Sequence, residues 1–297
     1  MVSKGTKTSS FGSSGRSNHD SSEFYNSRLY EGLNIPEKVD FIENEVPKKT
    51  LDKIFCKSSE SMDELPDNSV HLMVTSPPYN VKKEYDEDLS LEEYSILLRN
   101  VFEETYNKLV TGGRACVNVA NVGRKPYVPL HAMIIEIMLD IGYLMRGEII
   151  WDKSASAGSS TAWGSWQSAS NPVLRDIHEY ILIFCKESFS RKKNKSKENT
   201  IDRNGFLDWT KSIWSFPTVS AKKIGHPAPF PVELPHRLIQ LYTFKDEVVL
   251  DPFCGSGSAC LAALQDERRY IGYDIKNEYV ELSKKRLSEY KNQKTLI

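Results

Sequence analysis

The sequence predicts an α/β protein built on a doubly wound, mostly parallel seven-stranded sheet. From Lys53 onward, short apolar runs that suit buried strands alternate with segments of helical periodicity. Such alternation is typical of successive strand–helix–strand units, in which helices cover both faces of a mostly parallel sheet. The seven expected strands are 53–56, 70–74, 115–120, 147–151, 180–185, 247–251 and 270–274.

Five helices are expected between these strands, and the first has a recognisable start. Ser90 is followed three residues later by Glu93, which is the spacing of a capping box. This helix should stop before Gly112 and Gly113, because glycine is favoured just after a helix end. The other helices are expected at about 128–140, 232–242, 258–265 and 277–290.

Two irregular stretches divide the chain. Residues 154–175 are rich in Ser, Ala, Gly and Trp, and residues 188–223 carry the basic run 191–197. Loops this long in a compact domain are commonly functional or disordered. We therefore expect a flexible segment at 1–45, two halves of the main domain at 46–153 and 224–297, and between them an irregular region at 154–223 with one core strand near 178–185.

The composition is that of a globular protein. Hydrophobic residues make up 39% of the 297 residues, charged residues 27%, and the net charge is −1, so any nucleic-acid-binding surface must be a local basic patch. No apolar run approaches the roughly 20 residues that a membrane helix needs, and the N-terminus lacks the apolar core of a secretory signal. The five cysteines show no C-x-x-C spacing, which indicates reduced thiols in a cytoplasmic protein and no zinc site.

The most restrained loop of the chain is 75–80, Thr-Ser-Pro-Pro-Tyr-Asn, which follows an expected strand. Each proline fixes φ, removes a backbone donor and holds the preceding residue extended, so the strand cannot continue. The loop therefore presents the Ser76 hydroxyl, backbone carbonyls and the Tyr79 ring at the carboxyl end of a strand, where ligands bind in open α/β sheets. This arrangement suits a flat, amine-bearing group such as a nucleobase. The alternative is a simple loop terminator with a packed tyrosine.

A second loop, 251–257, reads Asp-Pro-Phe-Cys-Gly-Ser-Gly and lies between a buried strand and a helix start. Its glycines let the backbone pass close to a ligand, and the helix start offers N–H groups without intrahelical partners. About twenty residues later another strand ends at Asp274, where an acidic residue can bind ribose hydroxyls. Cys260 replaces the third glycine of the dinucleotide fingerprint, so a nucleoside without phosphates, such as S-adenosyl-L-methionine, fits better. The alternative is a glycine turn that only packs strand against helix.

Together the two loops resemble the motifs of S-adenosyl-L-methionine-dependent amino-group DNA methyltransferases. Residues 75–79 are similar to the family's catalytic motif in the form typical of N4-cytosine enzymes, and residues 251–257 are similar to its cofactor loop. The catalytic motif comes first, as in the permuted class called beta, and the resemblance covers about residues 50–290. It implies a circularly permuted class I methyltransferase fold. Its catalytic half would be 46–153, its inserted target-recognition region 154–223 and its cofactor-binding half 224–297.

The resemblance also implies a role for individual residues. The catalytic residues would be Ser76, Pro77, Pro78 and Tyr79, and the cofactor-binding residues would be Asp251, Phe253, Gly255, Gly257, Asp274 and Phe230. Phe230 lies in segment 226–231, whose counterpart helps to enclose the methionine end; the alternative is a proline-rich linker with a buried Phe. Many relatives carry Gly-Asp after the first strand, where this chain has Lys-Ser-Ser-Glu, so the adenine-side contact falls to Ser59 or Glu60.

The implied reaction is methyl transfer from S-adenosyl-L-methionine to the N4 amine of a flipped cytosine in double-stranded DNA, without a metal. Ser76 Oγ and the Pro77 carbonyl would accept the amine N–H groups and localise the nitrogen lone pair, while Tyr79 stacks on the base. An Asp in place of Ser76 is usual for adenine-N6 enzymes, so Ser76 favours cytosine. The alternatives are adenine N6 in DNA, an amine of RNA or a protein amide, and a catalytically silent nucleic-acid-binding module.

DNA contacts are expected within 154–223. The basic run 191–197 suits phosphates, although a solvated charged loop explains it equally well. Candidates for reading or wedging bases are Trp163, Trp166, Gln167, Asn171 and Arg175, whereas Trp209 and Trp214 could equally form a small satellite core. A cognate restriction endonuclease acting on the same site is the expected partner in a restriction-modification system, and the oligomeric state is open between monomer and homodimer.

Overall fold

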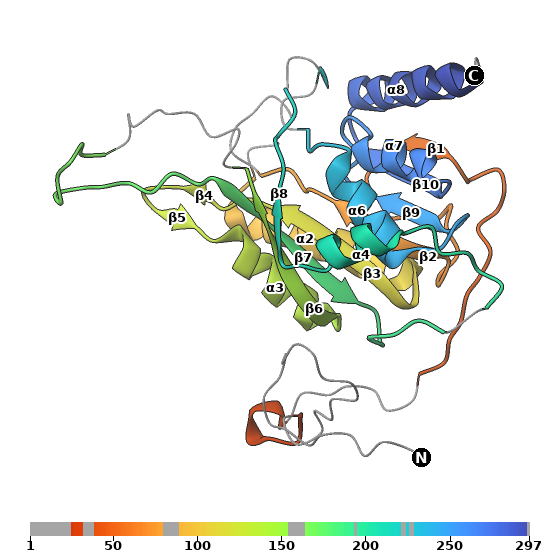
Figure 1. The fold of residues 1–297 in the computed structure, drawn as a ribbon, viewed down its shortest axis with the longest axis horizontal. Helices are drawn as coiled ribbons and strands as arrows, with labels where there is room; N and C mark the ends of the chain where they lie inside the picture. The colour runs from red at the N-terminus through yellow and green to blue at the C-terminus, as the bar shows by residue number, and fades with distance from the viewer. Residues whose placement is uncertain are drawn as a thin grey trace. The chain divides into compact units, whose positions relative to one another are not determined.

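A computed structural model describes residues 25–31, 39–79, 89–153, 164–192, 195–220, 224–225 and 229–295 (Figure 1). The chain divides into two compact units, 1–37 and 38–297, and the first contains the short 3-10 helix η1 (Arg28–Tyr30). Residues 39–45, the end of the segment expected to be flexible, lie in the second unit, where the Asn44 N–H donates to the Asn68 carbonyl over 2.7 Å.

Within the described part of the second unit, eight strands form one sheet in the order β1-β10-β9-β2-β3-β7-β6-β8. The strands are β1 (Lys53–Cys56), β2 (Val70–Thr75), β3 (Leu109–Val119), β6 (Leu144–Asp152), β7 (His178–Cys185), β8 (Ile213–Ser215), β9 (Val248–Asp251) and β10 (Arg269–Asp274). In this sheet β7 is antiparallel to its neighbours β3 and β6, and the other pairings are parallel. The mostly parallel sheet predicted from the sequence is confirmed. A separate ribbon pairs β4 (Val122–Gly123) with β5 (Tyr127–Val128).

The prediction of seven strands was one short. All seven are present, and β8 adds an eighth by pairing with the end of β6. Both β8 and the helix α4 (Arg203–Trp209) lie in the stretch 188–223 that was predicted to be irregular. They are too short to show a periodic pattern. Trp214 in β8 is 1% exposed, and Trp209 packs against the same core cluster, so these tryptophans belong to the core.

The capping box predicted at Ser90 is present at the start of α2 (Leu91–Lys108). The Glu93 N–H donates to Ser90 Oγ over 3.2 Å, and the Ser90 N–H donates to the Glu93 carboxylate over 2.8 Å. The helix ends at Lys108, directly before β3. Gly112 and Gly113 were predicted to mark the helix end, but they lie inside the strand. Gly112 has a φ of +76°, which favours glycine.

Helices cover both faces of the sheet, which is the doubly wound arrangement expected. On one face lie α2 and α3 (Leu130–Ile141); on the other lie α6 (Glu233–Tyr242), α7 (Ser258–Gln265) and α8 (Asn277–Thr295). Consecutive residues of β2 point to opposite faces: Met73 belongs to the first cluster and Leu72 to the second, and both are 0% exposed. None of the described helices combines the length and apolarity needed to cross a membrane.

Candidate active site

A cavity of about 320 Å³ lies at the carboxyl ends of β1, β2, β9 and β10. The loops that follow β2 and β9 meet there because these strands are neighbours in the sheet, with Leu72 opposite Val249 and Met73 opposite Leu250. The predicted site residues that line the cavity are Ser76, Pro77, Pro78, Tyr79, Phe230, Phe253, Gly255 and Asp274. The other two, Asp251 and Gly257, are not among the lining residues. One cavity thus brings together two sequence motifs from opposite ends of the chain.

Asp251 joins the two loops. Its Oδ1 accepts the Thr75 hydroxyl over 2.6 Å and the Phe253 N–H over 3.2 Å. Its Oδ2 is buried and has no hydrogen-bond partner among the described residues. The side chain is 1% exposed, and this burial raises the pKa of Asp251 to about 7, against the lowering effect of Thr75. An orphaned carboxylate oxygen here is suited to a donor from a bound molecule.

Asp274 is a carboxylate that lines the cavity, and it closes the glycine loop. The Gly255 N–H donates to its Oδ2 over 2.8 Å, and the Lys276 N–H donates to its Oδ1 over 2.9 Å. Burial raises the pKa of Asp274, although these backbone donors oppose the shift. Because a carboxylate oxygen has two lone pairs, both atoms can still accept hydroxyl groups from a ligand in the cavity.

Gly257 supports the loop from behind. It caps α7 with a φ of +75°, and a Cβ added there would lie 2.9 Å from the Cβ of Ser283 in α8. The Ser283 hydroxyl donates to the Gly255 carbonyl over 2.7 Å. Gly257 is therefore required for helix–helix packing that holds the loop, and its backbone does not line the cavity.

Hydrogen bonds hold the proline loop on both sides. The Tyr94 hydroxyl, on α2, donates to the Pro78 carbonyl over 2.6 Å. Ser76 Oγ and Tyr79 Oη lie 3.4 Å apart, and Tyr79 Oη donates to Glu179 over 3.3 Å. Burial raises the pKa of Tyr79 well above 10, so the ring remains neutral. The loop is a fixed wall with a hydroxyl and an aromatic ring directed into one cavity.

Sequence reasoning missed a polar pair at this wall, Asn118 of β3 and Glu179 of β7. Asn118 Nδ2 donates to Glu179 Oε2 over 2.6 Å, and Lys153 Nζ donates to Glu179 Oε1 over 2.6 Å. Asn118 is 2% exposed, lines the cavity, and its Oδ1 has no hydrogen-bond partner within the described part of the chain. A polar residue in each of two apolar strands, 115–120 and 178–185, is the signal that could have indicated these positions.

The turn after β1 and segment 229–230 form a further part of the cavity wall. Ser59, predicted as one of two adenine-side candidates, uses its hydroxyl to donate to the Pro252 carbonyl over 2.8 Å. Glu60, the other candidate, accepts Asn100 Nδ2 over 2.9 Å. Both line the cavity, as do Pro229 and Phe230. Of the predicted enclosing segment 226–231, residues 226–228 lie outside the described residues.

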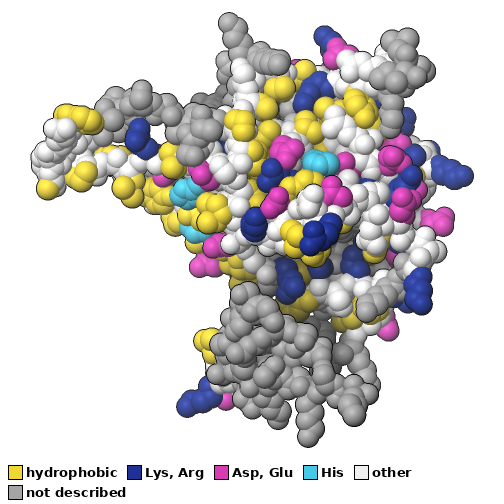
Figure 2. Space-filling view, viewed as in Figure 1, with side chains coloured by type: hydrophobic (Ala, Val, Ile, Leu, Met, Phe, Trp, Pro, Cys, Tyr) yellow, Lys and Arg dark blue, Asp and Glu magenta, His cyan; other side chains and the backbone are white. Residues whose placement is uncertain are grey.

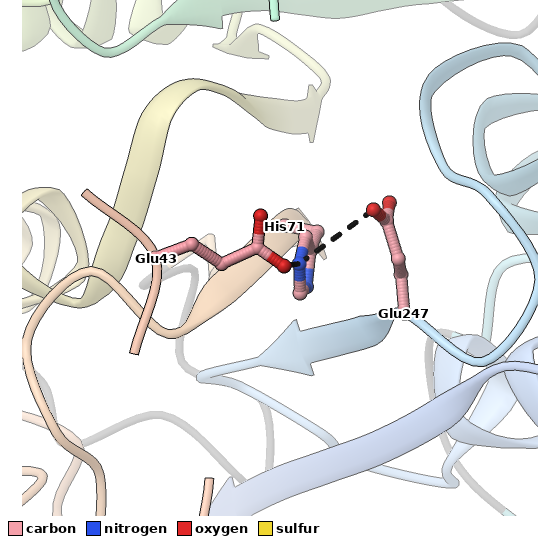
Figure 3. Close-up of side chains that lie close together, drawn as sticks. All are labelled: Glu43, His71 and Glu247. Atoms are coloured by element: carbon pink, nitrogen blue, oxygen red, sulfur yellow. Dashed lines mark hydrogen bonds and ion pairs between the residues drawn. The ribbon is translucent and has the colours of Figure 1, made fainter. Parts of the chain in front are cut away.

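The basic run 191–197 has a structural role at its two ends. Arg191 donates to the Glu247 carboxylate over 2.7 Å, and Lys197 donates to Glu247 over 2.8 Å and to Glu43 over 2.7 Å. His71 lies between these two carboxylates, with Nε2 3.0 Å from Glu43 and 3.6 Å from Glu247 (Figure 3). Glu247 is 3% exposed, so these pairs neutralise a buried charge and differ from the phosphate contacts considered for this run.

Residues 70–285 match the model of the N6_N4_Mtase family, described as DNA methylase. The chain belongs to the DNA methylase family. The type II methyltransferase M.MjaI of Methanocaldococcus jannaschii is 32% identical over 269 residues, which cover 76% of this chain and 88% of the relative. A protein of Thermus thermophilus, solved in complex with S-adenosyl-L-methionine, superposes with a TM-score of 0.63 at 28% identity, covering 80% of this chain and 95% of that chain.

The fold of this DNA methylase is also that of PvuII DNA methyltransferase, a cytosine-N4-specific enzyme. The TM-score is 0.63 at 23% identity, and the match covers 77% of this chain and 84% of that chain. This likeness confirms the class I methyltransferase fold that the sequence motifs implied. The expected enzyme class, a DNA methyltransferase, is confirmed by the family match.

Proposed function

We propose that this DNA methylase transfers a methyl group from S-adenosyl-L-methionine to the N4 amine of cytosine in double-stranded DNA. The observation that carries the proposal is the single cavity shared by the Ser76–Tyr79 loop and the Gly255–Asp274 loop. Methyl transfer requires the donor and the acceptor amine in one water-poor space, and positioning supplies much of the rate enhancement. A silent binding module would not require both loops to face the same cavity.

The cavity has a complementary group for each part of the donor. S-adenosyl-L-methionine supplies an electrophilic methyl group on a sulfonium. Asp274 accepts the ribose hydroxyls, since its carboxylate oxygens retain free lone pairs beside the Gly255 and Lys276 N–H groups. We assign the ammonium of the methionine part to Asp251 Oδ2, which is buried without a protein partner in the described residues; Asp251 does not itself line the cavity, so the wall must open for this contact. Phe253 and Phe230 provide apolar walls.

The acceptor amine lies at the proline loop. Ser76 Oγ and the Pro77 carbonyl accept its N–H groups, so that the nitrogen lone pair is localised and directed at the methyl carbon. The lone pair forms the new N–C bond, the electrons of the broken C–S bond return to sulfur, and the nitrogen then loses one proton. Tyr79, a half-buried neutral ring held by Glu179, stacks on the base. The site acts by preorganised hydrogen bonding and orientation.

Ser76 supports cytosine as the target base, and the comparisons support DNA as the substrate. Ser76 presents a neutral hydroxyl where the family's adenine enzymes usually present a carboxylate. The family match is to DNA methylases, and the relative M.MjaI is named a type II methyltransferase. We therefore place the protein in the cytoplasm as the modification enzyme of a restriction-modification system, with a cognate restriction endonuclease that acts on the same DNA site.

Nucleoside analysis tests this function directly. The purified protein is incubated with labelled S-adenosyl-L-methionine and unmodified genomic DNA, and the DNA is digested to nucleosides. We expect the label in N4-methylcytosine. Label in N6-methyladenine would show that the target base is adenine and not cytosine. The absence of label from every nucleoside would overturn the proposal. Ser76→Ala is the matched control, because it should lose turnover while it still binds the methyl donor.

A further inference from the structure

Residues 164–177, in the sequence between β6 and β7, form a projecting arm that leads into β7 beside the cavity. Trp151 and Glu179, which line the cavity, lie opposite each other in these strands, and the Lys153 N–H extends the pairing by donating to the Ile177 carbonyl over 2.7 Å. In Figure 1 the green segment that leads into β7 extends outward past β4 and β5. Residues 164–174, here called the arm tip, are the far part of this segment.

The arm tip is a closed loop with its own hydrogen bonds. Gly164 bridges Pro172, and the Ser165 N–H donates to the Asn171 carbonyl over 2.7 Å. The Ser165 hydroxyl donates to the Ser168 carbonyl over 2.6 Å and accepts the Asn171 N–H over 3.0 Å. Gln167 has a φ of +48°, a left-handed conformation that non-glycine residues rarely adopt. The surrounding bonds fix this conformation, so the tip presents its side chains from a defined frame.

The surface of the arm tip is uncharged, although charged residues make up 27% of the chain. Its polar side chains are Ser, Gln and Asn, and in Figure 2 the outermost part of the arm is white and yellow. Two large apolar side chains stand out: Trp166 is 67% exposed and Leu174 is 85% exposed. The salt bridge of 2.9 Å between Arg124 and Asp176 ties the base of the arm to the turn that follows β4.

Uncharged hydrogen-bonding groups around an exposed indole match the bases of DNA and not its phosphates. Gln and Asn bond base edges in a groove, whereas the charge that neutralises phosphates comes from Lys and Arg. Apolar side chains inserted between base steps fill and hold open an unstacked duplex. Resting on the proposed function, we propose that the arm tip enters the DNA groove beside the target, and that Trp166 fills the gap left when the target base turns into the cavity.

The placement of the arm supports this role. It leads directly into β7, the strand that carries Glu179 of the cavity wall, so the base of the arm lies beside the cavity. Six extended residues, 172–177, give the return limb a reach of up to roughly 20 Å. A tip at that reach can contact the duplex while the flipped base occupies the cavity.

The test compares two DNA duplexes. Methylome sequencing of cells expressing the chain identifies the recognition site, and one duplex carries this site fully paired. In the second duplex the target base stands opposite a non-complementary base, so that pairing is already broken and flipping costs less. On the paired duplex, Trp166→Ala should lower kcat/KM roughly tenfold or more, since stacking on an aromatic side chain is lost. On the mismatched duplex, the kcat/KM of Trp166→Ala should be close to that of the wild type.

Two further variants complete the test. Trp166→Phe should retain most activity on the paired duplex because it keeps an aromatic ring. Phe206→Ala removes a 52% exposed ring from α4 and should match the wild type on both duplexes. The inference is overturned if Trp166→Ala behaves as the wild type, if it loses equal activity on both duplexes, or if it abolishes a dimer that the wild type forms at assay concentration. If the wild type itself leaves cytosine unmethylated, the proposed function fails instead.

Discussion

Thr75 donates a hydrogen bond of 2.6 Å to Asp251, a residue 176 positions later in the chain, and this bond joins the strands that carry the two loops of the cavity. Thr75 precedes Ser76 directly, and Asp251 begins the glycine loop. Both residues are at most 1% exposed, so the bond is shielded from water. This buried bond therefore adds to the pairing of β2 and β9 in setting the position of the proline loop relative to the donor loop.

Thr75→Val tests this contact. The substitution keeps the shape of the side chain but removes the hydroxyl, which leaves Asp251 Oδ1 with only the Phe253 N–H. We expect the free energy of unfolding to fall by roughly 1–3 kcal/mol, as for other buried groups that lose a partner. Urea unfolding measures this change, and Thr75→Ser is the control that restores a hydroxyl. An unchanged midpoint in Thr75→Val would show that the bond contributes nothing.

Asp251 makes the affinity for S-adenosyl-L-methionine dependent on pH. Its pKa in the folded protein is about 7, and the ammonium of the donor requires the ionised carboxylate. Below pH 7 the carboxyl group must first lose its proton, so the dissociation constant should rise towards roughly tenfold per pH unit. Titration calorimetry from pH 5.5 to 8.5 measures the trend. Asp251→Asn should bind more weakly and show no such slope, and an equal slope in both proteins would contradict the assignment.

The same pKa gives a stability effect of opposite sense. The folded-state pKa of Asp251 lies above the value of about 3.9 in an unfolded chain, so the folded protein holds this proton more tightly. The contribution of Asp251 to stability is complete below about pH 4 and is lost as the pH rises through about 7. In the absence of donor, Asp251→Asn should therefore lose less stability than the wild type between pH 4 and 7, as measured by thermal unfolding.

Local signals in the sequence predicted the parts of the fold that local physics controls. The capping box at Ser90 and Glu93, the apolar runs and the strand-ending prolines depend on neighbouring residues, and all are present. Asp274 was also predicted from a local signal, the end of an apolar strand, and it lines the cavity. Gly112 and Gly113 were misassigned because glycine is favoured in two situations. One is a helix end, which was predicted, and the other is the close approach of another backbone, which the structure shows at Gly112.

Contacts made by long-range pairing could not be predicted. Asn118 and Glu179 meet because β7 runs antiparallel beside β3, and neither residue has a local signal for its partner. Arg191 resembled a phosphate contact because its run is basic, and the carboxylate that it neutralises, Glu247, lies 56 residues away. Sequence patterns therefore identified the two loops, and the sheet order was needed to find the groups that hold them.

The cluster of Glu43, His71 and Glu247 should not require a metal. The ligand atoms lie close enough together for an ion, but Lys197 and Arg191 already neutralise the carboxylates. Burial lowers the pKa of His71, so the ring is neutral; its Nδ1 accepts the Val248 N–H over 3.1 Å, which leaves the proton on Nε2 facing Glu43. We expect the melting temperature to be unchanged by EDTA or by added Zn²⁺. A clear shift with either reagent would show that an ion occupies the cluster.

Glu247→Gln is the companion variant for that cluster. Removing the buried negative charge leaves Arg191 and Lys197 with an uncharged partner, and breaking a buried ion pair on one side costs roughly 3–5 kcal/mol. Urea unfolding should show a loss of this size. Glu233→Gln, which breaks an i,i+4 pair with Arg237 in α6 where Glu233 is 44% exposed, is the surface control and should change stability by about 0.5 kcal/mol or less.

Glu179 should control turnover through the orientation of Asn118 and Tyr79. Its carboxylate accepts hydrogen bonds from Asn118, Lys153 and Tyr79, and the bond to Nδ2 fixes the Asn118 amide with Oδ1 as the available acceptor. In Glu179→Gln one of the accepting oxygens becomes a donor. Asn118 can then rotate its Oδ1 onto the new amide, and the cavity loses an oriented acceptor beside the proline loop.

We expect Glu179→Gln to lower the single-turnover methylation rate by roughly tenfold or more at saturating S-adenosyl-L-methionine, with the dissociation constant of the donor unchanged. Rapid-quench kinetics and calorimetry measure the two quantities separately. Asn118→Ala should lower the rate to a similar extent, and the double variant should lose little more, because both changes remove the same oriented acceptor. Additive losses in the double variant would show that Glu179 and Asn118 act independently, and a weakened donor affinity would place Glu179 with the donor loop.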